Sequence, residues 1–171
     1  MRPADLVPDC GSCAAICCVA TSFEQSEDFA FDKAAGTACV YVTGDCRCAI
    51  HHELVDRGMR GCAVYDCHGA GPYVTRAFGP GERDEAFLIL RVVHELVWLV
   101  SEALSLCPTS DLRAELAREL DTLDAIRAER IASLRELDLA GHDRRARSLL
   151  RRVGDALGGR GRRPRSLVVA K

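Results

Sequence analysis

The sequence predicts a mostly α-helical protein, with a small irregular α+β domain rich in cysteine at the N-terminus and an antiparallel three-helix bundle after it. Nine of the ten cysteines lie between Cys10 and Cys67, where the apolar residues show no sustained period. After residue 81 the apolar residues recur at helical spacing. The expected organisation is a cysteine-cluster domain over residues 1–82, a helical bundle over 83–158 and a basic tail over 159–171.

In the cysteine-rich domain the expected secondary structure is short. Apolar alternation predicts strands at 39–43 and 63–65. A short helix is expected at 49–57, closed by Gly58. The glycine- and proline-rich stretch 69–81 is interpreted as a linker. A domain with so few apolar runs needs another source of stability than a large core.

Three amphipathic helices are expected after the linker. In the first, over 84–106, polar residues fall every three or four positions and nearly all the others are apolar, so this helix is expected at the centre of the bundle. The spacing of leucine and isoleucine predicts a second helix over 112–137 and a third over 143–157, stopped by Gly158. Short connections between the three favour antiparallel packing.

Charge is segregated along the chain. The net charge is −2, but residues 141–171 contain ten of the 23 basic residues and two of the 25 acidic ones. Nine arginines lie within 144–165 without an aromatic residue among them, which argues against stacking on single-stranded nucleic acid. The basic tail is therefore expected to contact the acidic remainder of the chain or a second subunit, with nucleic acid as the alternative.

The sequence also bears on location and partners. The first residues have neither the apolar stretch nor the cleavage site of a secretory signal. The most hydrophobic stretch, 86–100, contains charged residues and is too short to span a bilayer. We expect a cytoplasmic protein with no membrane insertion, which binds an unidentified protein partner or associates with itself through its helices. In a reducing cytosol, clustered thiols are metal ligands more often than disulfides.

The cysteine spacing is typical of a metal site. The cluster opens with Cys10-Gly-Ser-Cys13 and the adjacent pair Cys17-Cys18, and such short gaps direct several thiolates at one ion or cluster. Metal would then supply the stability that the small core lacks. The candidate metal ligands are Cys10, Cys13, Cys17, Cys18, Cys39, Cys46, Cys48, Cys62 and Cys67.

The remaining ligand-type residues are interpreted differently. His51 and His52 follow Cys48 closely, and both a ligand role and a surface role stay open for them. His94 on the first bundle helix and Cys107 at its end are interpreted as structural residues.

Four stretches of the cysteine-rich domain resemble the YkgJ-type cysteine cluster proteins. They are Cys13-Ala-Ala-Ile-Cys17-Cys18, the stretch from Lys33 through Cys39 to Val42, Cys48-Ala-Ile and Gly61-Cys62. The resemblance covers about residues 10–70, and implies a zinc- or iron-chelating domain. The chain departs from the usual spacing at its start and adds Cys46 and Cys67, so the resemblance does not assign each thiol to an ion.

A closer likeness is to an actinobacterial group in which such a cluster precedes helices and often pentapeptide repeats. The stretch from Gly61 to Gly71, Gly-Cys-Ala-Val-Tyr-Asp-Cys-His-Gly-Ala-Gly, carries this likeness. A more distant likeness is to the flagellin lysine N-methylases, which have a similar cluster and are thought to depend on an iron–sulfur cluster. These likenesses imply a metal site more directly than any reaction.

Two kinds of metal group fit the number of thiols. One [4Fe–4S] cluster would use four of them, and two Cys₄ zinc sites would use eight. The likeness to the methylases favours the iron–sulfur cluster, with zinc as the alternative. The expected role is sensing, electron transfer or assembly. A metal-dependent enzyme such as a methyltransferase is the first alternative, although no catalytic group is legible and Gly69-Ala-Gly71 lacks the full nucleotide-binding fingerprint. A structural zinc adaptor is the second.

Overall fold

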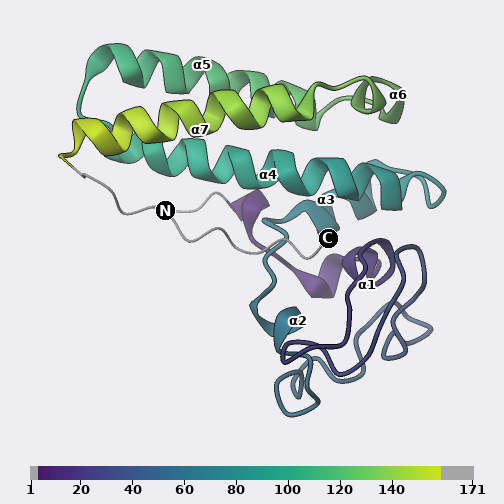
Figure 1. Cartoon of the computed structure of the whole chain (residues 1–171). Coiled ribbons are helices and arrows are strands. Elements are labelled where there is room, and N and C mark those ends of the chain that lie inside the picture. Colours follow the sequence, from purple (N-terminus) through teal and green to yellow (C-terminus); the bar gives the residue numbers. More distant parts are fainter. Residues whose placement is uncertain (1–3, 159–171) are drawn as a thin grey trace. The chain divides into compact units, whose positions relative to one another are not determined.

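The computed structural model describes residues 4–158, which are mostly helical, as predicted (Figure 1). The described residues form two compact units: unit 1 runs to Arg91 and unit 2 begins at Val92. In chain order the elements are the 3₁₀ turns η1 (Ala4–Leu6) and η2 (Cys10–Ser12) and the helices α1 (Ile16–Ala20), α2 (Arg60–Val64), α3 (Ala70–Ala77), α4 (Arg83–Leu106), α5 (Ser110–Arg127), α6 (Ile131–Arg135) and α7 (Leu139–Ala156). Helix α4 contributes residues to both units.

The two strands predicted for the cysteine-rich domain are wrong. Residues 39–43 contain only an isolated antiparallel bridge between Val42 and Cys48, and 63–65 overlaps the end of α2. The alternating apolar residues of 39–43 do not form a buried face, because the Val40 side chain is 76% exposed. A second isolated bridge joins Phe23 to Lys33. Unit 1 is therefore built from loops and short helices within the described residues.

Two further expectations for unit 1 are corrected. The helix predicted at 49–57 is a series of turns, although Gly58 ends it in a left-handed conformation (φ 71°), as its sequence position suggested. The predicted linker contains α3, whose Ala70 and Val74 are fully buried. Pro72 lies in the first turn of α3, where a helix does not use the missing N–H group, so this proline does not prevent the helix.

Unit 1 has two apolar centres. Phe23, Ile50 and Met59 form one, and the rings of Phe29 and Phe31 pack on Phe23 with centroid distances of 4.4 and 5.5 Å. The other includes fully buried side chains from η1, α3 and α4, namely Leu6, Ala70, Val74, Ala86, Phe87 and Leu90. Cys48 and Cys62 pack against the first of these centres.

Unit 2 contains the predicted helical bundle. Helices α4, α5 and α7 run side by side with alternating directions (Figure 1). Arg113 at the start of α5 donates to the carbonyls of Leu104 and Cys107 at the end of α4, and Arg127 at the end of α5 donates to His94. These contacts confirm that the two helices are antiparallel.

The polar stripe of the first bundle helix is also confirmed. Glu95, Trp98 and Glu102 are partly exposed, while the apolar positions between them are largely buried. The second predicted helix is divided into α5 and α6, because residues 128–130 are not helical. Nothing in the sequence of this break, Ala-Glu-Arg, punctuates a helix.

The described part of the basic segment is paired with acidic residues of unit 2. Arg152 makes two 2.6 Å hydrogen bonds to Glu115 of α5, and Arg145 lies 3.7 Å from Glu119. Arg147 pairs with Asp143 within α7. The predicted tail, 159–171, lies outside the described residues. Its contact with the acidic remainder of the chain stays a prediction.

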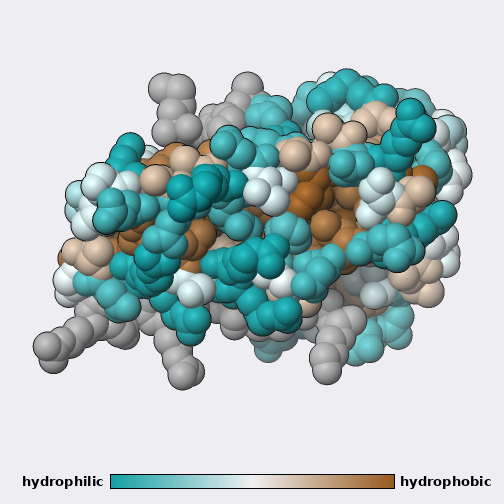
Figure 2. Space-filling model, turned by 90° about the horizontal axis from the view of Figure 1, so that it is seen from above, coloured by the Kyte–Doolittle hydropathy of each residue, from teal (hydrophilic) through white to brown (hydrophobic). Residues whose placement is uncertain are grey.

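No helix within residues 4–158 has the length and hydrophobicity needed to cross a bilayer. In the view of Figure 2, hydrophilic side chains cover most of the outer surface of the bundle helices, and apolar side chains show between them. This distribution is typical of amphipathic helices that bury one face.

The last turn of α7 provides a test of the bundle. Gly154 has no atom within 4 Å of the Cβ that an alanine would add. Because alanine loses less backbone entropy than glycine in a helix, we expect Gly154→Ala to stabilise unit 2 by about 0.5 kcal/mol. Thermal unfolding followed by the fluorescence of Trp98 measures this change. A lower Tm in the variant would contradict the packing described for α7.

Candidate metal centre

All nine predicted ligands lie in unit 1, and every cysteine of the chain is a free thiol in the structure. Seven of the nine are partly buried, and only Cys10 and Cys46 are exposed. Contacts and electrostatic interactions divide eight of them into two sets of four. The first thiol set is Cys10, Cys13, Cys17 and Cys67, and the second thiol set is Cys18, Cys39, Cys48 and Cys62.

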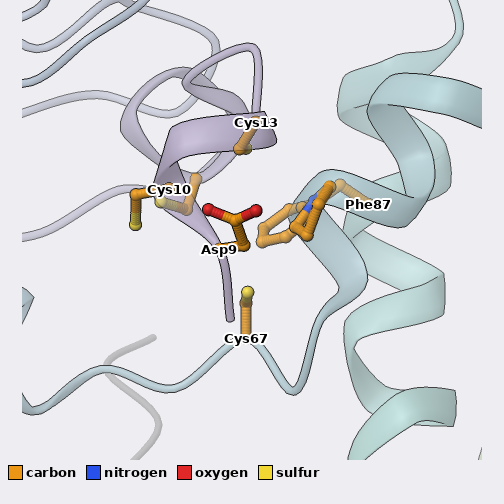
Figure 3. Close-up of a pocket in the computed structure, with 8 residues that line it drawn as sticks. Asp9, Cys10, Cys13, Cys67 and Phe87 are labelled. Carbon is orange, nitrogen blue, oxygen red and sulfur yellow. The ribbon is translucent and has the colours of Figure 1, made fainter. Parts of the chain in front are cut away.

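The first thiol set lines one hollow in unit 1. Cys10 lies in η2, Cys17 in α1 and Cys67 in the loop before α3. Figure 3 shows Cys67 pointing toward Asp9, with Cys10 and Cys13 beyond the carboxylate and Phe87 beside it. The complete lining is Asp9, Cys10, Cys13, Cys17, Cys67, Gly71, Pro72 and Phe87.

The thiols of the first set lie within electrostatic reach of one another. Burial raises the pKa of Cys10, and the charges of Cys13, of Cys67 and of Cys18 from the second thiol set raise it further. Burial also raises the pKa of Cys13, although the Ile16 N–H group and the Thr75 side chain act in the opposite direction. Four thiolates without a cation would repel one another here. The first thiol set therefore offers four sulfur donors whose ionised forms a bound cation would stabilise.

Local backbone contacts position the first set. The Asp9 carboxylate accepts the Gly11 N–H group at 2.9 Å and thereby caps η2. Thr75 on α3 accepts the Ala14 N–H group at 3.0 Å, which ties the Cys13 segment to α3. Asp66 accepts the His68 N–H group at 2.7 Å and shapes the loop that carries Cys67.

Gly71 allows the close approach of two thiols. A Cβ at this position would lie 2.8 Å from the Cys13 sulfur and 3.8 Å from the Cys67 sulfur. If the first thiol set holds a metal, we expect Gly71→Ala to displace Cys13 and weaken metal binding by about tenfold or more. Gly44→Ala is the matched control, because nothing lies within 4 Å of its added Cβ. Competition with a chelator measures both affinities. Equal affinities in the two variants would contradict the role assigned to Gly71.

The second thiol set gathers around the Phe23–Ile50–Met59 cluster. The Cys39 N–H group donates to the Cys18 carbonyl at 3.0 Å, and Cys48 and Cys62 both pack against the apolar cluster. Burial raises the pKa of Cys62 to about 12, and the charges of Cys18, Cys39 and Cys48 act in the same direction. Burial likewise raises the pKa of Cys48, opposed by the Ile50 N–H group.

Lys33 places a cation beside the second thiol set. The residue is 6% exposed, and its ammonium group donates to the carbonyls of Val19, Thr21, Ala34 and Thr37 at 2.5–3.2 Å. Burial lowers the pKa of Lys33, and the charges of Cys39 and Cys18 oppose that change. The carbonyls belong to the segments that carry Cys18 and Cys39, so Lys33 fixes the separation of these two segments.

The sequence interpretation missed the role of Lys33. The signal available was compositional: it is the only lysine among residues 4–158, which otherwise use arginine for positive charge. A compact ammonium group donates in several directions, whereas the planar arginine fork does not suit carbonyls that converge on one point.

Cys17 and Cys18 join the two sets. They are adjacent residues of α1, and their sulfurs lie 4.0 Å apart. The hydrogen bond from Cys17 lowers the pKa of Cys18 to about 7, with help from the Lys33 charge and against the effect of burial. The same contact and burial raise the pKa of Cys17 well above its usual range.

The other candidate residues lie elsewhere. Cys46 is exposed in a turn, at a positive φ of 59°, and belongs to neither set. His51 and His52 are exposed, with their rings 5.6 Å apart. Cys107 is buried in unit 2, 3.6 Å from the Thr109 carbonyl. His68, which is buried beside Cys67, was not singled out from the sequence.

In the part of the chain that the structure describes, no three His, Cys, Asp or Glu side chains lie close enough to hold a metal ion as they stand. Binding would require the sulfurs of a set to move toward a common point. Rotation about χ1 provides such movement for side chains on short helices and loops. The donors themselves suit a metal with an affinity for sulfur, such as iron in a cluster or zinc.

Comparison with known proteins adds one relative. The chain is 34% identical over 153 residues to the uncharacterized protein YybG of Bacillus subtilis (strain 168), and the match covers 83% of the chain. It covers 54% of YybG, so the chain spans about half the length of this curated relative. No protein-family profile and no solved structure matches the chain.

Proposed function

We propose that this chain is a cysteine-ligated metal-binding protein and that its metal centre lies in unit 1. The observation that supports the proposal is the gathering of eight thiols, from segments far apart in the sequence, into two sets of four. Cysteines that act only as small apolar residues do not need other thiols beside them, whereas a metal site needs several. The resemblance to the YkgJ-type family points in the same direction.

An iron–sulfur cluster is the metal group that we propose first. Such a cluster is held by four thiolates, and hydrogen bonds to its sulfur ligands tune its redox potential. In unit 1, hydrogen bonding from the Ile16 N–H group favours the thiolate of Cys13, and hydrogen bonding from the Ile50 N–H group favours that of Cys48. These residues would hold and orient the ligands in a protein that senses, transfers electrons or delivers a cluster.

Zinc is the second candidate, and the number of thiols favours it. Two structural zinc ions would use the eight sulfurs of both sets and would stabilise a unit with little regular structure. Unit 2 would then act as the part of an adaptor that binds a protein partner. The methyltransferase alternative has less support. A Cβ atom at Gly69 would collide with Asp5 and one at Gly71 with Cys13, so these glycines are explained by close packing within unit 1 and not by nucleotide binding.

The test is metal and sulfide analysis of the full chain purified without oxygen. An iron–sulfur protein is expected to be brown and to contain iron and acid-labile sulfide in equal amounts. Zinc without sulfide would identify the second candidate. The proposal fails if the protein contains less than one equivalent of iron and zinc together, both as purified and after reconstitution.

A further inference from the structure

We infer that unit 1 holds two metal centres, one in each thiol set, coupled through the adjacent residues Cys17 and Cys18 of α1. This inference rests on the proposed function and adds the number of centres and their mutual dependence. Each set has four thiols, which is the full complement of a tetrahedral zinc ion or of one [4Fe–4S] cluster.

The division between the sets falls within one short helix. Adjacent residues of an α-helix point about 100° apart around its axis, so their side chains can extend toward different neighbours even though the Cys17 and Cys18 sulfurs lie 4.0 Å apart. Cys17 faces the hollow shared with Cys10, Cys13 and Cys67. Cys18 interacts electrostatically with Cys48 and Cys62, and its carbonyl accepts the Cys39 N–H group. Cys17 lines the hollow and Cys18 does not, while Cys18 also interacts electrostatically with Cys10 and Cys13, so this pair lies where the two sets meet.

The charges around the two sets differ. Asp9 lines the hollow of the first thiol set, whereas the buried ammonium group of Lys33 lies beside the second. Four thiolates around a divalent ion carry a net charge of about −2, and two such centres repel each other. Lys33 offsets part of this repulsion at the second set, which makes simultaneous occupation of both sets possible at short range.

Two physical links couple the sets. The first is α1, which has only five residues, so that an ion bound to Cys17 also fixes the position of Cys18. The second is Arg47, which follows the exposed Cys46 and precedes Cys48 and donates to the Cys10 carbonyl at 3.1 Å. The sulfurs of Cys17 and Cys18 lie 4.0 Å apart. If one ion bound each sulfur at the usual zinc–sulfur distance of about 2.3 Å, the two ions would be at most about 9 Å apart.

The consequence is cooperative loading. Binding at one set orders a ligand of the other, so the second ion binds to a partly ordered site and pays less of the ordering entropy. Zinc is a suitable probe whichever metal the protein holds in the cell, because it requires four thiolates and no sulfide.

The experiment is native mass spectrometry of the reduced full chain during titration with zinc. The wild-type protein is expected to bind two ions, and at one equivalent the metal-free and two-zinc forms should exceed the one-zinc form. Cys67→Ser removes a ligand of the first thiol set and Cys62→Ser one of the second, and each should reduce the zinc content to one tight ion. Cys46→Ser is the control and should bind two.

Several outcomes would overturn the inference. One zinc per wild-type chain, or loss of an ion in Cys46→Ser, contradicts the two sets. A one-zinc form that dominates at one equivalent contradicts the coupling. Should the cysteine variants misfold, ¹¹³Cd NMR of the wild-type chain decides: two tetrathiolate signals support the inference and one signal refutes it. A single bound metal leaves the proposed function intact, whereas less than one equivalent of iron and zinc together, both in the purified chain and after reconstitution, refutes the proposed function itself.

Discussion

Replacing Lys33 by methionine is expected to destabilise unit 1 by about 2–4 kcal/mol and to abolish tight metal binding at the second thiol set. The methionine fills a similar volume but donates no hydrogen bond to the four carbonyls around the ammonium group. Buried carbonyls left without a donor each cost about 1–3 kcal/mol. The carbonyls of Val19 and Ala34 are spared because they also accept the Gly36 and Thr37 N–H groups, which leaves those of Thr21 and Thr37. The loss of positive charge next to Cys18 and Cys39 adds to the effect on metal binding.

Arg57→Met is the matched control for this variant. It also removes a cation from unit 1, but Arg57 is exposed and pairs with Glu53 in an i, i+4 contact. Such pairs contribute about 0.3–0.5 kcal/mol. Urea unfolding followed by the near-ultraviolet signal of the tyrosines measures both variants. If the free energies of unfolding of Lys33→Met and Arg57→Met differ by less than about 1 kcal/mol, which is the upper range for one exposed ion pair, the ammonium group does not have the structural role described here.

Removal of the metal is expected to unfold unit 1 while the helices of unit 2 remain folded. Unit 1 has only short helices and isolated bridges besides the start of α4, so little except its two apolar centres and the metal would oppose unfolding. Helices α5 and α7 have 18 residues each and pack through buried leucines and valines. The far-ultraviolet circular dichroism should therefore keep most of its helical signal.

The aromatic residues make this prediction sharp. All three tyrosines, Tyr41, Tyr65 and Tyr73, lie in unit 1, and the one tryptophan, Trp98, lies in unit 2. A chelator should abolish the near-ultraviolet dichroism of the tyrosines and leave the fluorescence spectrum of Trp98 unchanged. Retention of the tyrosine signal after complete removal of metal would show that metal does not hold unit 1 together. Loss of both signals would show that the two units unfold as one.

The helices were predictable from the sequence because their signals are local. Apolar periodicity placed α4, α5 and α7, and Gly58 marked the end of the turns before α2 with its positive φ. The strands were predicted wrongly because alternation indicates a strand only where a partner and a buried face exist, and Val40 has neither.

The residues of the candidate site could be predicted from the sequence, but their arrangement in space could not. The density of cysteines identified the thiols, but it also included Cys46, which is exposed in a turn at a positive φ and belongs to neither set. The division at Cys17 and Cys18 depends on the geometry of α1. The position of Lys33 among four carbonyls depends on loops that meet only in the folded chain. The division has no signature in a single sequence, and for Lys33 the sequence shows only that residues 4–158 contain no other lysine.

Residue-resolved alkylation tests most directly the claim that the two thiol sets hold metal. Cys10 and Cys46 form the decisive pair, because both are exposed and only Cys10 belongs to a set. In the protein purified without oxygen, Cys46 is expected to react rapidly whether or not a chelator is present. Cys10 and the other thiols of the two sets are expected to react only after a chelator removes the metal. If Cys10 reacts as fast as Cys46 before any chelator is added, the claim that the first thiol set holds a metal is wrong.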